Sequence, residues 1–217
     1  MSVTFEPGLL RAYFVAGSQD VPDQDLRKVL ATMLAAGITA FQFRDKGNSQ
    51  LTPDQRLALG KDLRDQCHAA SVPFIVDDDV EMALALHADG IHVGQSDQKI
   101  QQVIQEVSGQ NMFVGLSCST AAEVAAANQL TGVDYLGSGP IFPTTSKDDA
   151  DPVIGVAGLE KLVAQANVPI VAIGGITVDS LAAVAATGAA GVAVITLLTR
   201  STSPAKDVAA MRQAFHN

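Results

Sequence analysis

The sequence predicts a (β/α)8 barrel, in which eight parallel strands form a closed ring surrounded by helices. Short runs rich in Val, Ile, Leu and Phe alternate with longer, alanine-rich segments whose apolar residues recur at helical spacing. Strands that are almost continuously apolar are buried on both faces, which is typical of parallel pairing. Eight such units in 217 residues fit this fold, whose smallest members have about 200 residues. We expect one domain over residues 1–217, because no linker or composition shift divides the chain.

Each expected strand is followed by an amphipathic segment. The expected strands are Arg11–Ala16, Ala40–Arg44, Phe74–Asp77, Gly90–Val93, Met112–Ser117, Val133–Gly137, Ile170–Gly174 and Gly191–Thr196. The expected helices are Asp25–Ala36, Pro53–Ala70, Val80–His87, Lys99–Val107, Ala121–Leu130, Val156–Ala166, Asp179–Ala186 and Pro204–Phe215. The alternative is a doubly wound open sheet, which needs a Gly-rich turn after the first strand, and the sequence VAGS at 15–18 matches that turn only weakly.

The charge balance excludes one class of partner. The formal net charge is −9, and the sequence contains no run of Lys or Arg. A nucleic-acid-binding protein needs a basic stripe to displace counterions, so we expect no nucleic-acid partner. A small anionic substrate fits only if the few cations are concentrated at one site.

The apolar segments and the cysteines bear on location. No apolar stretch reaches the roughly 20 residues needed to span a bilayer, so we expect no membrane association. The first residues, MSVTFEPGLLRAYFVAG, lack a basic leader, and we expect no signal peptide. Cys67 and Cys118 are isolated, without the spacing of a zinc site or a disulfide framework. Reduced thiols are typical of the cytoplasm, where we expect this protein.

The second strand ends in the sequence FQFRDK, whose polar residues form a candidate anion-binding group. Alternation along the strand places Gln42, Arg44 and Lys46 on one side and the two phenylalanines on the other. The phenyl rings suit packing against helices, so the polar side chains point into the barrel mouth, where active sites of this fold lie. The alternative is a solvated strand end in which Arg44 pairs with Asp45.

Three consecutive carboxylates, Asp77, Asp78 and Asp79, end the third strand and begin the next loop. We expect Asp79 to cap the following helix, because side-chain oxygens satisfy the free N–H groups of a helix N-terminus. Capping does not account for all three carboxylates. A divalent cation would relieve their repulsion, and Asp97 after the fourth strand would reach the same rim, as in many Mg²⁺ sites. On these residues alone, a structural role and a metal site are equally open.

The loop after the sixth strand, in the sequence YLGSGPIFPTTSK, is unusually rich in polar side chains at 144–147. Three hydroxyls and an ammonium on a proline-stiffened loop exceed what a turn requires. The glycine pair after the seventh strand lets a ligand approach the backbone, and Thr196 at the end of the eighth strand lies near it. Loops after these two strands form the usual phosphate site of the fold.

The remaining strand ends offer hydroxyls and one histidine. The fifth strand ends in GLSCS, which places Ser117 and Ser119 near the rim. His92 lies within an apolar strand, so we expect a hydrogen-bonded core or rim histidine rather than a general base. Together, the strand ends favour a site for two anionic ligands, a metal-bound diphosphate and a monophosphate. Cations and Mg²⁺ in one cleft would stabilise a departing diphosphate by electrostatics.

These motifs, in this order, resemble those of the thiamine-phosphate synthase family over nearly the whole chain. The matching stretches are QFRDK, FIVDDDVEMALALHADGIHVGQSD, GLS, DYLGSGPIFPTTSK, VAIGGIT and GAAGVAVIT. The resemblance implies condensation of 4-amino-5-hydroxymethyl-2-methylpyrimidine diphosphate with 4-methyl-5-(2-phosphoethyl)thiazole to give thiamine monophosphate and pyrophosphate. It implies a dissociative step, in which pyrophosphate leaves before the thiazole nitrogen attacks the pyrimidine methylene, and one Mg²⁺ ion per site.

The resemblance also implies a role for each motif residue. Arg44, Ser117 and Lys147 would act on the departing diphosphate, while Asp78 and Asp97 would hold Mg²⁺. The residues implied to bind the two substrates are Gln42, Phe43, Arg44, Asp45, Lys46, Asp77, Ser117, Thr144, Thr145, Ser146, Lys147, Gly175, Ile195 and Thr196. The residues implied to contact the thiazole phosphate are Thr144, Thr145, Ser146, Gly175, Ile195 and Thr196. A homo-oligomer is compatible with the sequence.

The sequence departs from the family pattern at four positions. Asp77 stands where the pattern usually has Asn, and an ionised carboxylate accepts hydrogen bonds but donates none. Either Asp77 accepts from the exocyclic amine of the pyrimidine, or neighbouring carboxylates keep it protonated, which is the alternative we expect. Ser146 and Thr196 keep the hydroxyl of the residues they replace. Ser119 stands where many members have His, which argues against a base there.

Two rival functions share the barrel and a phosphate site. A thiazole tautomerase of the same superfamily would need a proton-transferring group, often the missing His, and would not need the metal pair. A non-catalytic phosphate-ligand-binding barrel would result if Asp77 had abolished catalysis. The metal pair, Asp78 and Asp97, together with Arg44 and Lys147, favours the synthase.

Overall fold

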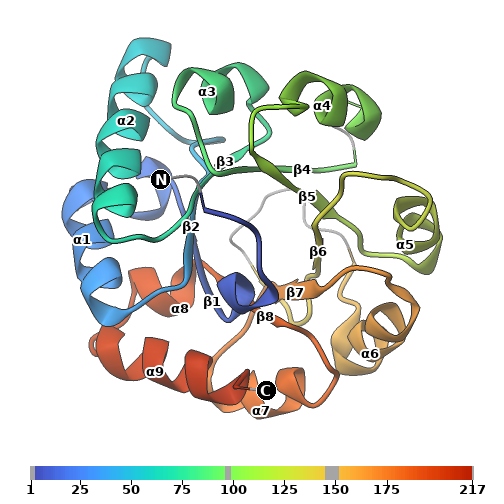
Figure 1. The fold of residues 1–217 in the computed structure, drawn as a ribbon. Helices are drawn as coiled ribbons and strands as arrows, with labels where there is room; N and C mark the ends of the chain where they lie inside the picture. The colour runs from blue at the N-terminus through green and yellow to red at the C-terminus, as the bar shows by residue number, and fades with distance from the viewer. Residues whose placement is uncertain (1–2, 96–98, 145–151, 217) are drawn as a thin grey trace.

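The strands of the computed structural model form a closed barrel in which neighbours follow chain order and the last strand pairs with the first (Figure 1). The structure describes residues 3–95, 99–144 and 152–216. All of the strand pairings are parallel, which confirms the predicted (β/α)8 barrel. The strands are β1 (Ala12–Ala16), β2 (Ala40–Phe43), β3 (Phe74–Asp77), β4 (Gly90–Val93), β5 (Phe113–Ser117), β6 (Tyr135–Ser138), β7 (Ile170–Ile173) and β8 (Gly191–Val194).

Helices surround the barrel, as the view along its axis shows (Figure 1). They are α1 (Leu26–Ala36), α2 (Pro53–Ala69), α3 (Val80–Ala85), α4 (Ile100–Val107), α5 (Ala121–Ala127), α6 (Gly155–Gln165), α7 (Leu181–Ala185), α8 (Thr196–Thr199) and α9 (Pro204–Ala214). Short 3₁₀ turns are η1 (Pro7–Leu10), η2 (Ser18–Asp20) and η3 (Val178–Ser180). In the described ranges, no helix is both long and apolar enough to cross a membrane.

Two segments near the site differ from the prediction in the type of element that they form. The eighth strand ends at Val194, and Thr196 begins the short helix α8 instead of ending the strand. A short apolar run does not distinguish strand from helix by periodicity. The segment expected as one helix from Asp179 begins as the turn η3, because the Ser180 hydroxyl bonds the backbone N–H and C=O of Thr177.

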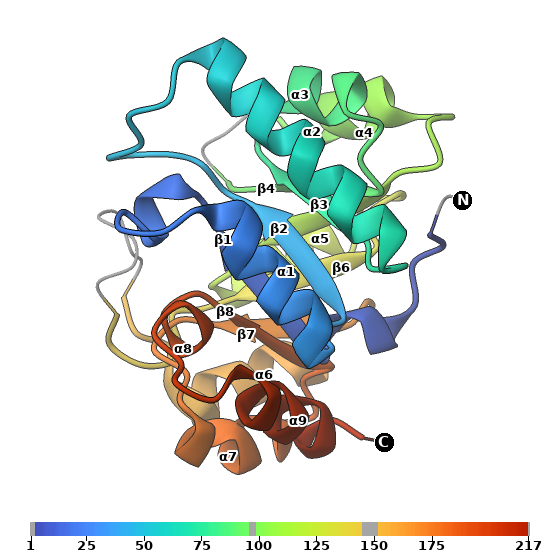
Figure 2. The same cartoon turned by 90° about the vertical axis from the view of Figure 1, so that its left-hand side faces the viewer.

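Two apolar layers hold the barrel together. Alternate strand side chains point outward and pack under the helices, including both phenylalanines of β2, as predicted. The inner layer holds Tyr13 and Tyr135, the two tyrosines of the chain, among smaller apolar residues. Phe5 stacks on Tyr135 with ring centroids 5.7 Å apart and lies 5.5 Å from the ring of Phe113, at the start of β5. These rings close the end of the barrel opposite the strand C-termini, the side on which both chain termini lie in Figure 2.

Candidate active site

A cavity of about 320 Å³ opens at the C-terminal ends of the strands. The predicted site residues that line it are Arg44, Lys46, Asp77, Asp78, Ser117, Thr144, Gly175, Ile195 and Thr196. His92, Ser119 and Glu123 line it as well. A smaller adjoining space reaches into the barrel interior to Tyr13 and Gln42. The barrel therefore brings together residues that are spread over most of the sequence.

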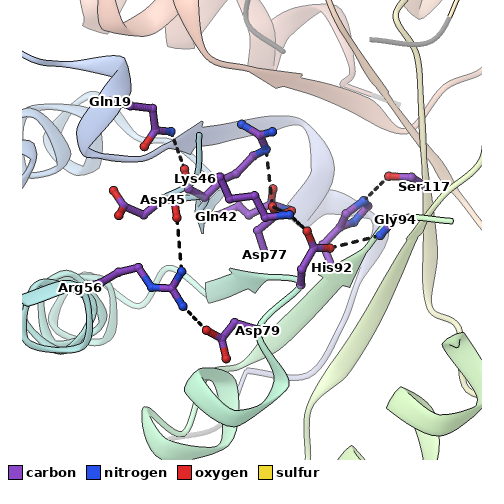
Figure 3. A network of polar contacts seen from close by, with 12 residues as sticks. Gln19, Gln42, Asp45, Lys46, Arg56, Asp77, Asp79, His92, Gly94 and Ser117 are labelled. Carbon is purple, nitrogen blue, oxygen red and sulfur yellow. Dashed lines mark hydrogen bonds and ion pairs between the residues drawn. The ribbon is translucent and has the colours of Figure 1, made fainter. Parts of the chain in front are cut away.

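Two cations lie at this cavity beside two carboxylates. Arg44 Nε is 3.5 Å from Asp77 Oδ2, and Lys46 Nζ is 3.2 Å from the same oxygen (Figure 3). Lys46 also forms an ion pair with Asp78. Arg44 and Lys46 are the basic residues among the described residues that line the cavity. Two of the three cations that the sequence predicts at the site therefore lie together at this cavity.

Phe43 and Asp45 do not line the cavity. Phe43 is buried in the outer layer under the helices. Asp45 accepts hydrogen bonds from Ser18 N at 2.8 Å, from Ser18 Oγ at 2.6 Å and from Ser49 Oγ at 2.6 Å. The alternative in which Arg44 pairs with Asp45 is therefore wrong. Asp45 ties the loop after β2 to η2, and this holds the cations on either side of it at the cavity.

The neighbouring aspartates of the third strand have separate roles. Asp79 caps α3 by accepting a hydrogen bond from Met82 N at 2.9 Å, as predicted, and pairs with Arg56. Asp78 has a left-handed backbone with φ of 59°, a conformation that Asp adopts more readily than most residues. Its Oδ1 accepts from Gly94 N at 3.3 Å, which ties the loop after β3 to the end of β4. Asp78 is thus the carboxylate of this loop that the backbone holds at the cavity.

Asp77 lies between the two cations, with 9% of its side chain exposed. Two cations within ion-pair distance stabilise a carboxylate. Both alternatives for Asp77, a carboxylate that only accepts hydrogen bonds and a protonated group that also donates, stay predictions. The structure adds Arg44 and Lys46 to the neighbours of Asp77 that the sequence shows, which are the adjacent carboxylates.

A chain of hydrogen bonds runs through the barrel interior from Gln42 to Ser117. Gln42 Nε2 donates to Tyr13 Oη at 2.8 Å, and Tyr13 Oη lies 3.0 Å from Tyr135 Oη. Tyr135 Oη is 3.0 Å from Nδ1 of His92. Nε2 of His92 is 2.9 Å from Ser117 Oγ (Figure 3). His92 is hydrogen-bonded on both ring nitrogens, which confirms the expectation of a satisfied histidine. The sequence does not single out Tyr13 and Tyr135 as site residues, because an aromatic residue in an apolar strand is typical of a buried core position.

Burial of these tyrosines predicts a pH dependence of stability. Burial raises the pKa of both Tyr13 and Tyr135 above the ordinary value of about 10. Above pH ~10 the unfolded chain loses protons that the folded chain keeps, so the free energy of unfolding falls by up to about 1.4 kcal/mol per pH unit for each tyrosine. The measurement is tyrosinate absorbance, which is clean because the chain has two tyrosines and no tryptophan. Tyrosinate appearing near pH 10 in a chain with native circular dichroism would contradict the prediction.

The loops after β6 and β7 meet backbone against backbone. Phe142 N donates to Gly174 O at 3.0 Å, and Ile141 N donates to Ile173 O at 3.0 Å. Gly175 has φ of 66°, and a Cβ atom on it would lie 2.6 Å from the carbonyl oxygen of Pro143. The glycine that was predicted to let a ligand approach the backbone therefore also lets the two loops pack together.

Four predicted site residues, Asp97, Thr145, Ser146 and Lys147, lie outside the described residues. In the ranges that are described, no group of three His, Cys, Asp or Glu side chains could hold a metal ion. Asp78 is the predicted metal ligand that the structure places at the cavity. In many Mg²⁺ sites, one or two protein carboxylates share the ion with substrate phosphates.

Comparison with known proteins decides the family. A family model described as thiamine monophosphate synthase matches residues 12–198. The chain belongs to the thiamine monophosphate synthase family. It is 79% identical to the thiamine-phosphate synthase of Levilactobacillus brevis over 99% of both chains. It is 67% identical to that of Lactiplantibacillus plantarum, over 99% of this chain and 98% of the relative.

A solved structure agrees with this assignment. Thiamine phosphate pyrophosphorylase from Pyrococcus furiosus matches with a TM-score of 0.83 and 31% identity, covering 97% of this chain and 98% of that one. As a member of the thiamine monophosphate synthase family, the chain is an enzyme of the transferase class. These relatives carry the synthase name, which supports neither the tautomerase nor the non-catalytic barrel.

Proposed function

We propose that the chain joins 4-amino-5-hydroxymethyl-2-methylpyrimidine diphosphate to 4-methyl-5-(2-phosphoethyl)thiazole, forming thiamine monophosphate and pyrophosphate. The observation that carries this proposal is the gathering of Arg44 and Lys46 at one cavity of a chain whose net charge is −9. Such a site stabilises a diphosphate as it leaves carbon, and the dissociative reaction needs positioning but no dedicated base.

Arg44, Lys46 and Ser117 are proposed to bind the departing diphosphate. A unit charge pair at 4 Å is worth about 1 kcal/mol in water and about 4 kcal/mol in a partly solvent-excluded cleft. Two cations therefore account for a sizeable part of the barrier reduction, and Lys147 would add a third. Asp77, whose carboxylate lies beside two cations, would accept a hydrogen bond from the exocyclic amine of the pyrimidine.

One Mg²⁺ ion is part of the proposal, held by Asp78 and Asp97. The donor set fits, since Mg²⁺ is commonly bound by one or two carboxylates together with substrate phosphates. The ion would neutralise charge on the diphosphate. In the structure, Lys46 pairs with Asp78. When the substrate binds, a phosphate oxygen would replace this carboxylate as the partner of Lys46.

The reaction itself tests the proposal. The protein is incubated with both substrates and Mg²⁺, and pyrophosphate and thiamine monophosphate are measured together. Equal amounts of the two products, with release that depends on the thiazole, are expected. Pyrophosphate release without thiamine monophosphate, or no release at all, would contradict the proposal.

The thiazole phosphate is proposed to bind at the loops after β6, β7 and β8. We expect Gly175→Ala to raise the KM for the thiazole phosphate about tenfold, since a left-handed conformation costs an L-residue ~1–2 kcal/mol and the new Cβ would displace the loop after β6. Initial rates at varied concentrations of each substrate measure this. Gly109→Ala is the control, because Gly109 has φ of 81° with open space around it. Equal KM changes in both variants would contradict the assignment.

A cytoplasmic location is also part of the proposal. Cys67 and Cys118 are both free thiols, and such thiols persist in a reducing compartment. Burial raises the pKa of Cys118 to about 12, so this thiol near the fifth strand stays protonated at neutral pH.

A further inference from the structure

The hydrogen-bond chain from Gln42 to Ser117 has a direction that is set at its first member. An amide nitrogen only donates, so Tyr13 Oη accepts from Gln42, and its own proton goes to Tyr135 Oη, its other partner in the described part of the chain. Tyr135 then donates to Nδ1 of His92, which leaves the proton of the neutral imidazole on Nε2. Nε2–H of His92 donates to Ser117 Oγ. The proton of Ser117 is therefore directed away from His92.

The barrel interior is built around the pair formed by His92 and Tyr135. Gly115 lies beside both residues in the strand register, and a Cβ atom on it would overlap the phenol ring and Nδ1 of the imidazole. A Cβ atom on Gly137 would lie 2.9 Å from Cε1 of His92. Any larger residue at either glycine would displace the pair. The glycines of β5 and β6 thus leave the space that the side chains of His92 and Tyr135 occupy.

We propose that Tyr13, Tyr135 and His92 are positioning residues that fix the Ser117 hydroxyl as a hydrogen-bond donor to the anionic leaving group. The inference rests on the proposed function, in which that group is the diphosphate. A serine hydroxyl can donate or accept, and the chain decides which. With its lone pair engaged by His92, Ser117 turns its proton toward the cavity that it lines. A donor already oriented needs no reorganisation when negative charge develops.

The same direction excludes one alternative role. A histidine that acted as a base toward Ser117 would need an unprotonated nitrogen facing the hydroxyl. The nitrogen facing Ser117 is Nε2, which carries the proton when Tyr135 donates to Nδ1. His92 therefore orients Ser117 and does not activate it. Reversal of the chain would present lone pairs of Ser117 to the diphosphate, and these would repel it.

Nitrogen-15 NMR of the histidine rings tests the direction without any substrate. The full-length chain has four histidines, and His92→Gln assigns the signal of His92 by its loss. At about pH 8.5, where an ordinary histidine is neutral, we expect His92 to be protonated on Nε2. Tyr13→Phe should weaken this preference through Tyr135, which hydrogen-bonds to both Tyr13 and His92. An Nδ1–H tautomer in the wild-type protein would overturn the proposal.

Kinetics test the consequence for Ser117. Tyr135→Phe keeps the ring and should lower kcat about tenfold, the worth of one hydrogen bond to a charged group, with both KM values within about threefold. Ser138→Ala is the matched control, because its buried hydroxyl donates to Cys118 O at 2.7 Å outside the chain of hydrogen bonds. It should leave kcat within about twofold.

A double-mutant cycle separates positioning from general destabilisation. In a Ser117→Ala background, Tyr135→Phe should not lower kcat further, because the hydroxyl that it orients is gone. Additive losses, or a loss in Ser138→Ala as large as that in Tyr135→Phe, would overturn the proposal. If the wild-type protein forms no thiamine monophosphate, the proposed function fails, and the NMR result still decides the direction of the chain.

Discussion

Replacing Arg44 by alanine is expected to lower kcat/KM for the pyrimidine diphosphate about 100- to 1,000-fold, the usual cost of removing one group that stabilises developing negative charge. Arg44 is one of the two cations among the described cavity-lining residues, and its side chain is only 14% exposed. A charge held in a partly solvent-excluded cleft acts more strongly than one in water. The measurement is the initial rate of pyrophosphate release at low substrate concentration.

The loss in Arg44→Ala has two physical sources that need separation. The diphosphate loses a cation, and Asp77 loses a partner, so Asp77 would draw Lys46 more strongly to itself. Adding Asp77→Asn removes the second effect and leaves the first. We expect the double variant to regain less than a tenth of wild-type activity, because the missing cation dominates.

Arg27→Ala is the control for a general loss of positive charge. Arg27 lies in the first turn of α1 and forms exposed ion pairs with Asp25 and Asp62, which contribute little to stability. Its removal should leave kcat/KM unchanged. A wild-type rate in Arg44→Ala, or an equal loss in Arg27→Ala, would contradict the assignment of Arg44 to the diphosphate.

The fold was predictable because each strand carries its own signal. Phe74–Asp77 and Gly90–Val93 have the bounds that the sequence predicts, since both are short apolar runs bounded by polar or small residues. The end of β8 was not predictable, because the residues around Thr196 are apolar enough for either a strand or a helix. Local patterns thus gave the elements and left some of their ends undefined.

The site was predictable where one strand end carries its own chemistry. The alternation in β2 predicted that Gln42 and Arg44 point into the barrel mouth. Arg44 lines the cavity there, whereas Gln42 is buried deeper in the barrel, beside Tyr13. The environment of Asp77 was not predictable, because the cations beside it come from another strand. The hydrogen bond between Tyr135 and His92 was not predictable either, because the two residues lie on different strands and the sequence does not give the register between strands.

Removal of Mg²⁺ by a chelator is expected to abolish turnover and to leave the fold unchanged. Mg²⁺ is commonly held by one or two carboxylates together with substrate phosphates, so we expect a site that the diphosphate completes. Such an ion does not contribute to folding in the way that a structural zinc ion does. The melting temperature should therefore stay within about 2 °C when the chelator is added, a change of less than ~1 kcal/mol.

The same reasoning predicts that Mg²⁺ and pyrophosphate stabilise the protein together. At a pyrophosphate concentration about 100-fold above its dissociation constant in the presence of Mg²⁺, binding adds about 2.7 kcal/mol. For a chain of this size that raises the melting temperature by about 5–10 °C. Mg²⁺ alone should raise it far less, because the protein supplies only part of the ligand set.

Two aspartate variants test which carboxylate binds the ion. Asp78→Asn should remove the contribution of Mg²⁺ to the joint stabilisation and lower turnover strongly. Asp79→Asn is the matched control, because Asp79 caps α3 and pairs with Arg56, and Asn is itself a good capping residue. It should keep the Mg²⁺ response and lose only the ion pair. Full turnover in the presence of the chelator, or a large fall in melting temperature on its addition, would contradict a catalytic ion at Asp78.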